Sequence, residues 1–210
     1  MDFDSFLTHI SSLKDMPLGG MDSQFKMAPA IRRDVVLENL IKANPKDSAV
    51  LALFYPDKAN QTNFLLTQRA SYNGTHSSQI SFPGGKMEKR DTNLEYTALR
   101  ETFEETGVLH NDIIIYRQIT KTYIPPSNFW VTPFIGFLDY TPKLVASHEV
   151  SEFIEVKLKD LLDDTSITSK NLTTSYMKNI DVPCFKLNNY IVWGATAMIL
   201  SEIKDLIKSI

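Results

Sequence analysis

Residues 82–108 read FPGGKMEKRDTNLEYTALRETFEETGV, a stretch that places a glycine turn directly before a charged helix. Gly84 and Gly85 form the turn, and Gly107 stands where a left-handed C-cap residue is expected. We therefore predict a helix over Leu94–Thr106, held between two backbone stops. This turn–helix unit is the reference point for the rest of the chain.

The predicted helix carries three glutamates, Glu101, Glu104 and Glu105, at offsets of three and four residues. Residues at these offsets lie on one face of an α-helix, where three carboxylates repel one another unless a cation sits between them. Carboxylate oxygens on a rigid element suit Mg²⁺ or Mn²⁺. The alternative is a solvated face with ion pairs such as Arg100 with Glu104. The flanking glycine stops favour the metal site.

The segment resembles the Nudix box, whose family pattern is Gly-x5-Glu-x7-Arg-Glu-U-x-Glu-Glu-x-Gly-U, with U a bulky apolar residue. The matching residues are Gly85, Arg100, Glu101, Glu104, Glu105, Gly107 and Val108. The gap from Gly85 to Arg100 is one residue longer than the pattern, so Asp91 or Glu88 is the nearest acid to the early glutamate. Thr102 stands where the family has an aliphatic residue.

The longer gap resembles the coenzyme A diphosphatase branch of this family. An upstream signature of that branch is matched by Leu65, Leu66, Thr67, Arg69, Ala70, Phe82, Pro83, Gly84, Gly85 and Lys86. The segments 27–29, 123–129 and 192–197 are also similar to that branch. Gly74 and Ser78 depart from it, since they stand where the signature has arginine and glycine.

The resemblance implies a metal-dependent hydrolase of a diphosphate linkage, with coenzyme A or its thioesters split into 4'-phosphopantetheine and adenosine 3',5'-bisphosphate. The departures leave two alternatives open. One is a Nudix pyrophosphatase for ADP-ribose, NADH or another nucleotide. The other is a non-catalytic nucleotide-sensing domain, although such domains usually lose box carboxylates and this chain keeps three.

Roles in the expected site follow from the helix and from the resemblance. The residues assigned to catalysis are Arg100, Glu101, Glu104, Glu105 and Glu152. Metal ligands are expected at Glu101, Glu105 and Glu104, and the family resemblance implies the backbone carbonyl of Gly84 or Gly85 as a further ligand. Substrate phosphate is expected to contact Arg69, His76 and Lys86. The general base stays open between Glu149 and Glu152.

Apolar periodicity indicates an α/β chain with a mixed β-sheet between helices, and the resemblance implies the Nudix-type α/β/α sandwich. Strands are expected at 49–55, 63–69, 79–82, 113–120, 130–140 and 152–156, with a late hairpin at 173–177 and 183–187. Helices are expected at 3–13, 34–43, 94–106, 158–162 and 195–207, and residues 15–30 are expected to be irregular. We expect residues 1–210 to form a single Nudix hydrolase domain, with residues 1–45 as an N-terminal helical extension packed on it.

Composition narrows the class of protein. The chain is 43% hydrophobic and 22% charged with a net charge of -3, so we expect no nucleic-acid partner. Its single cysteine, Cys184, excludes an intrachain disulfide, and we expect no membrane partner because no apolar run is long enough to span one. The acidic start of the chain argues against a secretory signal, so a cytoplasmic location is expected. The apolar N-terminal helix covers either the core or a partner subunit, which leaves a homodimer open.

Overall fold

The computed structural model describes residues 1–29, 44–70, 79–173 and 178–210. Its main sheet has eight strands, and five of them follow the order β3-β2-β1-β7-β5. The strands are β1 (Lys46–Pro56), β2 (Thr62–Arg69), β3 (Ile80–Ser81), β4 (Gly84–Lys86), β5 (Ile114–Gln118), β6 (Thr122–Ile124), β7 (Phe129–Phe137) and β8 (Val150–Lys157). Strands β1 and β7 pair in parallel from Lys46↔Phe129 to Phe54↔Phe137, while the other pairs are antiparallel. The main sheet is therefore mixed.

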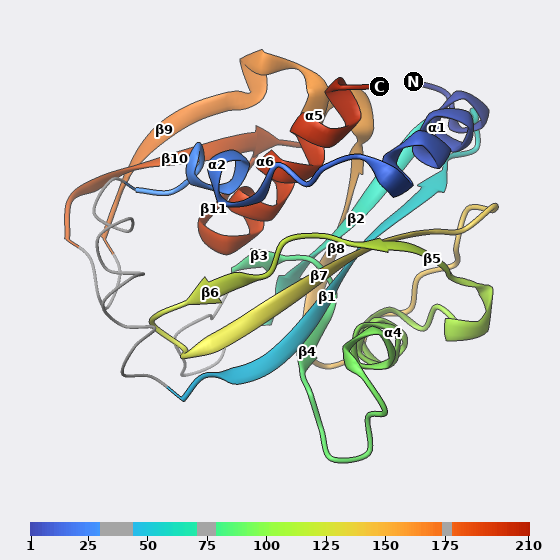
Figure 1. The fold of residues 1–210 in the computed structure, drawn as a ribbon, viewed down its shortest axis with the longest axis horizontal. Coiled ribbons are helices and arrows are strands. Elements are labelled where there is room, and N and C mark those ends of the chain that lie inside the picture. The colour runs from blue at the N-terminus through green and yellow to red at the C-terminus, as the bar shows by residue number, and fades with distance from the viewer. Residues whose placement is uncertain (30–43, 71–78, 174–177) are drawn as a thin grey trace.

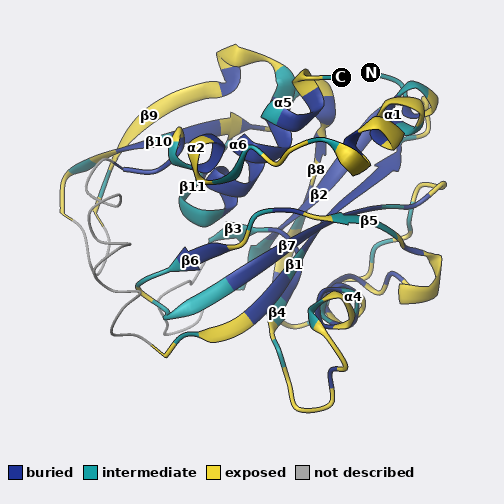
Figure 2. Cartoon of the chain, in the orientation of Figure 1, coloured by how far each residue is buried: buried dark blue, intermediate teal, exposed yellow. Residues whose placement is uncertain are grey.

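A second, three-stranded sheet lies beside the main one (Figure 1). It has the order β11-β10-β9, formed by β9 (Ile167–Leu172), β10 (Ile180–Leu187) and β11 (Tyr190–Trp193). Strand β9 is exposed along most of its length (Figure 2), whereas β10 buries Val182, Phe185 and Leu187. The outer strand thus faces solvent and the middle strand joins the core.

The helices cover the two faces of the main sheet unequally (Figure 1). Helix α4 (Leu94–Thr106) covers one face. The elements on the other side are α1 (Phe3–Ile10), the 3₁₀ helix η1 (Ser11–Asp15), α2 (Gly20–Phe25), α5 (Leu158–Leu162) and α6 (Gly194–Lys208). Two short 3₁₀ helices each lie between an α-helix and a strand: η2 (His110–Asp112) precedes β5, and η3 (Asp164–Ser166) precedes β9. The result is a sandwich with the sheet between helical layers.

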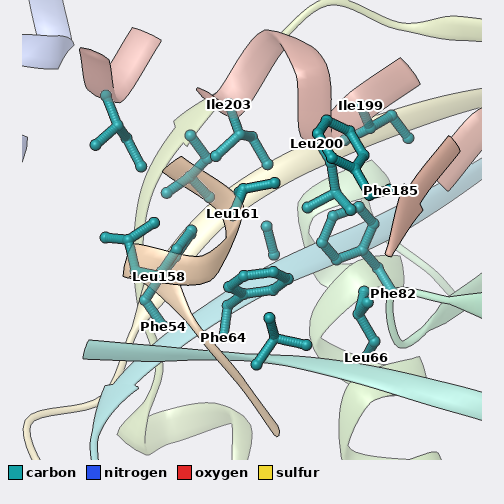
Figure 3. Close-up of a cluster of buried hydrophobic side chains, with 14 of the residues drawn as sticks. Phe54, Phe64, Leu66, Phe82, Leu158, Leu161, Phe185, Ile199, Leu200 and Ile203 are labelled. Carbon is teal, nitrogen blue, oxygen red and sulfur yellow. The ribbon is translucent and has the colours of Figure 1, made fainter. Parts of the chain in front are cut away.

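Strand β1 shows why the sheet is buried on both faces. Successive side chains of a strand point to opposite faces, so an apolar run such as 49–55 must be covered twice. Leu51, Leu53 and Tyr55 pack in the smaller cluster under α4, while Ala52 and Phe54 face the larger cluster. Figure 3 shows that larger cluster, in which Phe54, Phe64 and Leu66 of the main sheet meet Leu158, Leu161, Phe185, Ile199, Leu200 and Ile203.

The N-terminal residues belong to the same larger cluster. Phe3, Phe6, Ile10 and Leu13 are buried there, and the Phe6 ring lies 5.0 Å from the Phe54 ring. The Phe3 amide donates to the Asn60 carbonyl. These contacts place α1 and η1 in the same hydrophobic core as the main sheet.

Most predicted elements are present, and some predictions are wrong. The helices at Leu94–Thr106 and Leu158–Leu162 have the predicted bounds. Residues 15–30 are not wholly irregular, because α2 forms within them. A late hairpin exists, in which Ile167–Leu172 pairs with Ile180–Leu187. Most of the strand expected at 173–177 lies outside the described residues. Strands β4, β6 and β11 were not predicted, and the helix expected at 34–43 lies outside the described residues.

No helix in the described ranges is long and apolar enough to cross a membrane.

Candidate active site

Helix α4 holds the acidic ridge and is fixed at both ends. The Asn93 side chain accepts a hydrogen bond from the Tyr96 amide at 2.7 Å, which satisfies one of the free N–H groups at the helix start. Gly107 ends the helix at φ 75°, and its amide donates to the Phe103 carbonyl at 2.8 Å. The stop predicted at Gly107 is confirmed, whereas the helix begins at the Asn93 cap and not at the glycine turn.

Thr102 occupies the aliphatic position of the family pattern without leaving a polar atom unpaired. The residue is fully buried, and its hydroxyl donates to the Ala98 carbonyl at 2.7 Å. This back-bond to the preceding turn lets a hydroxyl replace an aliphatic group in the core.

Arg100 is the electrostatic centre of the helix. Its side chain is 6% exposed, and Nη1 donates to Glu101 at 2.8 Å and to Glu104 at 3.0 Å. Nη2 also donates to the backbone carbonyl of Lys86 at 3.1 Å. Arg100 thus orients two glutamates and ties α4 to β4.

Asp91, one of the two acids nearest the early glutamate of the motif, is the partner of Arg100. Its buried carboxylate accepts from Arg100 Nε at 2.8 Å and from Arg100 Nη2 at 2.9 Å, in the bidentate geometry that favours strong pairing. Thr97 and the Glu88 amide also donate to it. The hydrogen bonds from Arg100 are the main cause of a pKa of Asp91 well below its usual range. Asp91 therefore takes the place of the early acid, and the longer gap is absorbed in the turn before it.

Glu105 is the most deeply placed acid of the ridge. It is 5% exposed, and its carboxylate accepts from the Gly84 amide at 3.3 Å. Burial raises the pKa of Glu105 to about 7, against the lowering effects of Arg69 and the Gly84 amide. Burial also raises the pKa of Glu101, and the nearby carboxylates of Glu104 and Glu149 add to that shift. The site therefore disfavours its own negative charge.

The glycine turn lies against these acids. A Cβ added at Gly85 would fall 2.5 Å from the Glu101 carboxylate carbon. Gly84 has φ +147°, a backbone conformation that side chains rarely adopt, and it faces Val50 of β1. Two glycines in a row thus allow the β4 backbone to approach the acidic helix.

The donor set fits a divalent cation in chemistry and in charge. Glu101, Glu104 and Glu105 supply only carboxylate oxygens. The pKa values of Glu101 and Glu105 are raised mainly by burial and further by neighbouring carboxylates, so a nearby cation would stabilise their ionised forms. The carboxylates do not converge on one point: no group of three or more acids, histidines or cysteines in the described residues is already arranged around a metal position. Glu101 and Glu104 turn to Arg100, and Glu105 turns to Gly84, so binding requires these side chains to rotate.

A cavity of about 850 Å³ opens beside the ridge. Its charged lining residues are Arg69, Lys86, Glu88, Glu101, Glu104 and Glu149. Arg69 lies 3.5 Å from Glu149, and the buried Arg69 Nε makes no hydrogen bond within the described part of the chain. Lys86 is exposed and lines the cavity. Arg69 and Lys86, both predicted to contact phosphate, are thus brought to the acids.

The other predicted residues fall elsewhere. Glu152 is exposed on β8 and does not line the cavity. Its carboxylate accepts a hydrogen bond from the Tyr190 hydroxyl, which raises the pKa of Tyr190. Glu149 lies at the cavity instead, where its backbone carbonyl accepts from the Ala70 amide. His76 lies outside the described residues. The uncharged side of the cavity was not predicted, because its residues come from three separated segments.

The fold and this acidic helix match known proteins. The model of the NUDIX domain family matches residues 45–175, and the chain belongs to that family. Members of the family generally use divalent metal ions, and the chain is an enzyme, a pyrophosphatase of the Nudix type.

Individual relatives agree with this assignment. The chain is 29% identical to Nudix hydrolase 3 of Caenorhabditis elegans over 79% of this chain and 74% of that protein. It is 28% identical to the peroxisomal coenzyme A diphosphatase ndx-8 of the same organism, over 73% of this chain and 65% of that protein. A Nudix hydrolase from M. smegmatis, RenU, has the same fold, with a TM-score of 0.55, 15% identity, and coverage of 79% of this chain and 88% of that one.

Proposed function

We propose that this protein hydrolyses the diphosphate linkage of coenzyme A or its thioesters, with Mg²⁺ or Mn²⁺, to 4'-phosphopantetheine and adenosine 3',5'-bisphosphate. The observation that carries the proposal is the acidic ridge at the mouth of a cavity that also has a long uncharged side. The similarity to a coenzyme A diphosphatase supports the same substrate class.

The chain's residues position the substrate for attack by water. Glu101, Glu104 and Glu105 would hold the cation, which, when bound, neutralises charge on the phosphate oxygens and lowers the pKa of a water. Arg69, whose Nε makes no hydrogen bond to the described residues, would donate to a phosphate oxygen. Lys86 would add a second positive charge from the other side of the glycine turn. Arg100 pairs with Glu101 and Glu104, and these pairs would rearrange as the two glutamates turn to the cation.

Glu149 is our candidate for the general base. It lines the cavity, its carboxylate lies beside Arg69, and it is close enough to Glu105 to affect the pKa of that group. Glu152, the residue assigned from the sequence, makes its contact with Tyr190 outside the cavity. We expect Glu149→Gln to lower kcat by about 10²- to 10⁴-fold. Glu152→Gln, three residues away, is the matched control and should stay near wild type; the reverse result would return the role to Glu152.

A substrate panel tests the proposal. The purified protein is given coenzyme A, ADP-ribose, NADH and a nucleoside triphosphate with Mg²⁺ or Mn²⁺, and the products are separated. We expect coenzyme A to give the highest kcat/KM and to release adenosine 3',5'-bisphosphate. A higher kcat/KM for ADP-ribose or NADH would make that compound the proposed substrate in place of coenzyme A. Binding without any product would indicate a nucleotide-sensing domain instead of an enzyme.

The cytoplasmic location and a homodimer stay predictions. Fractionation of the cells and light scattering of the purified protein would measure them.

A further inference from the structure

Among the described residues, the charged side chains that line the cavity come from one set of neighbouring elements. Those residues belong to β2, β4, the turn after β4, α4 and the segment before β8. The lining residues contributed by the β6–β7 segment, by β10 and β11, and by the start of α6 include no charged side chain within the ranges that the structure describes.

The second sheet builds one wall of this uncharged side. Ile191 and Trp193 are two residues apart on β11, so they share a face. Trp193 pairs with Cys184 on β10, and Ile180 lies four residues before Cys184 on the same face. Ile180, Ile191 and Trp193 therefore lie on one face of the second sheet, and all three line the cavity. Lys186, opposite Ile191 on the same face, is not among the lining residues.

The main sheet supplies the rest of the uncharged side. Ile124, Pro125, Phe129 and Val131 come from β6, β7 and the turn between them. Val131 pairs with Ser48 of β1, and Ser48 in turn pairs with Lys86 of β4. This register places the uncharged side directly next to the charged side, across two strands of the sheet.

The described lining residues of this side offer an anionic group no charged partner. A phosphate placed against them would lose hydration without gaining an ion pair from any of them, which is unfavourable. A coenzyme A thioester has unequal halves: a 3'-phosphorylated nucleotide on one side of the diphosphate, and an uncharged acyl-pantetheine arm on the other. The charge distribution of the cavity matches that asymmetry in one orientation.

We propose, resting on the coenzyme A function above, that Ile180, Ile191 and Trp193 are specificity-determining residues that hold the acyl-pantetheine arm. The adenosine 3',5'-bisphosphate half then lies on the charged side, with the diphosphate at the acidic ridge between them. Because the acyl group contacts apolar side chains, the enzyme prefers thioesters of longer apolar acyl groups over the acetyl thioester.

The test compares kcat/KM for coenzyme A and for its acetyl and hexanoyl thioesters. The reaction is monitored by the release of adenosine 3',5'-bisphosphate. Burial of a methylene favours binding by up to about fourfold, so the hexanoyl thioester should exceed the acetyl thioester by roughly tenfold or more. The double variant Ile180→Thr/Ile191→Thr keeps β-branched side chains and should bring this ratio close to one. Ile167→Thr is the control, because Ile167 is exposed on β9 and does not line the cavity.

Each outcome decides the proposal. A wild-type ratio near one, or a double variant that keeps the wild-type ratio, overturns the role of the three residues while the coenzyme A function stands. Absence of cleavage of every coenzyme A compound overturns both. If the double variant melts far below wild type, Ile191→Thr alone is measured, and it must still lower the ratio while Ile167→Thr does not.

Discussion

Glu105 joins the two properties on which the site depends, a buried position and a negative charge. Its raised pKa means that ionisation of the carboxylate is costly where it lies. Because the carboxylates of Glu101 and Glu149 lie nearby, the ridge is a favourable place for a cation. A group of this kind is expected to contribute to function at the expense of stability.

Glu105→Gln removes that charge and keeps the side-chain volume. We expect kcat/KM with Mg²⁺ to fall by at least about a hundredfold, since the group acts by electrostatic stabilisation. The melting temperature without metal should stay at or above wild type at pH 8, because the costly carboxylate is gone. Glu95→Gln, on the first turn of the same helix, is the control. Turnover at the wild-type rate would remove Glu105 from the site.

Asp91 and Arg100 form the buried pair behind the site. Asp91→Asn leaves Arg100 short of a charge partner, so the free energy of unfolding at pH 6 should fall by roughly 3 kcal/mol. Denaturant titration measures this difference against wild type.

The difference in free energy of unfolding between wild type and Asp91→Asn should become smaller as the pH falls. Because the pKa of Asp91 is lowered in the folded protein, its stabilisation is present above the unfolded value near 3.8 and is lost as pH falls. Below about pH 4 the gap between wild type and Asp91→Asn should shrink by up to about 1.4 kcal/mol per pH unit. A gap that widens on acidification would contradict the ion-pair role.

At the scale of elements, the caps of α4 are the part most open to a direct test. Asn93→Ala removes the hydrogen bond to the Tyr96 amide, and the free energy of unfolding should fall by about 1 kcal/mol. Thr92→Ala, one residue earlier and exposed, should change it little. Equal effects of the two substitutions in denaturant titrations would show that the cap contributes nothing specific.

The elements also show which parts of the fold a sequence can predict. Helix α4 was predicted with its bounds because local signals, two glycine stops and a charged periodic run, specify it. Helix α2 lacks such signals: it is six residues long and forms through long-range contacts with α6, such as Gln24 with Glu202 and the Ser201 hydroxyl with the Ser23 carbonyl. Strand β4 was missed for the same reason, since two of its three residues are glycines.

The residues of the candidate site also divide into those that local sequence predicts and those that only the tertiary fold brings together. The glutamates were predicted because they lie within one helical segment. The pairing of Asp91 with Arg100 was not, since it depends on how the extra residue is accommodated in the turn at 88–91. The uncharged side of the cavity joins β6, β10 and β11, whose proximity is a property of the tertiary fold alone.

At the scale of the whole molecule, a substitution in the N-terminal helix tests whether residues 1–45 belong to the domain. Phe6 is 1% exposed and packs against Phe54 in the main cluster. Phe6→Ala should lower the free energy of unfolding by about 3–5 kcal/mol through the cavity that it leaves. Thr8→Ala, on the exposed side of the same helix, is the control. A small loss for Phe6→Ala would mean that the helix is an accessory that the domain does not need.

The parallel pairing of β1 with β7 has a consequence for how the enzyme comes into being. The two strands are about 80 residues apart in the chain, and the glycine turn of β4 is anchored on β1. Contacts between such distant segments form late and slowly, because a large loop must close first. A nascent chain that has left the ribosome only as far as α4 therefore carries every box glutamate and still has no working catalyst.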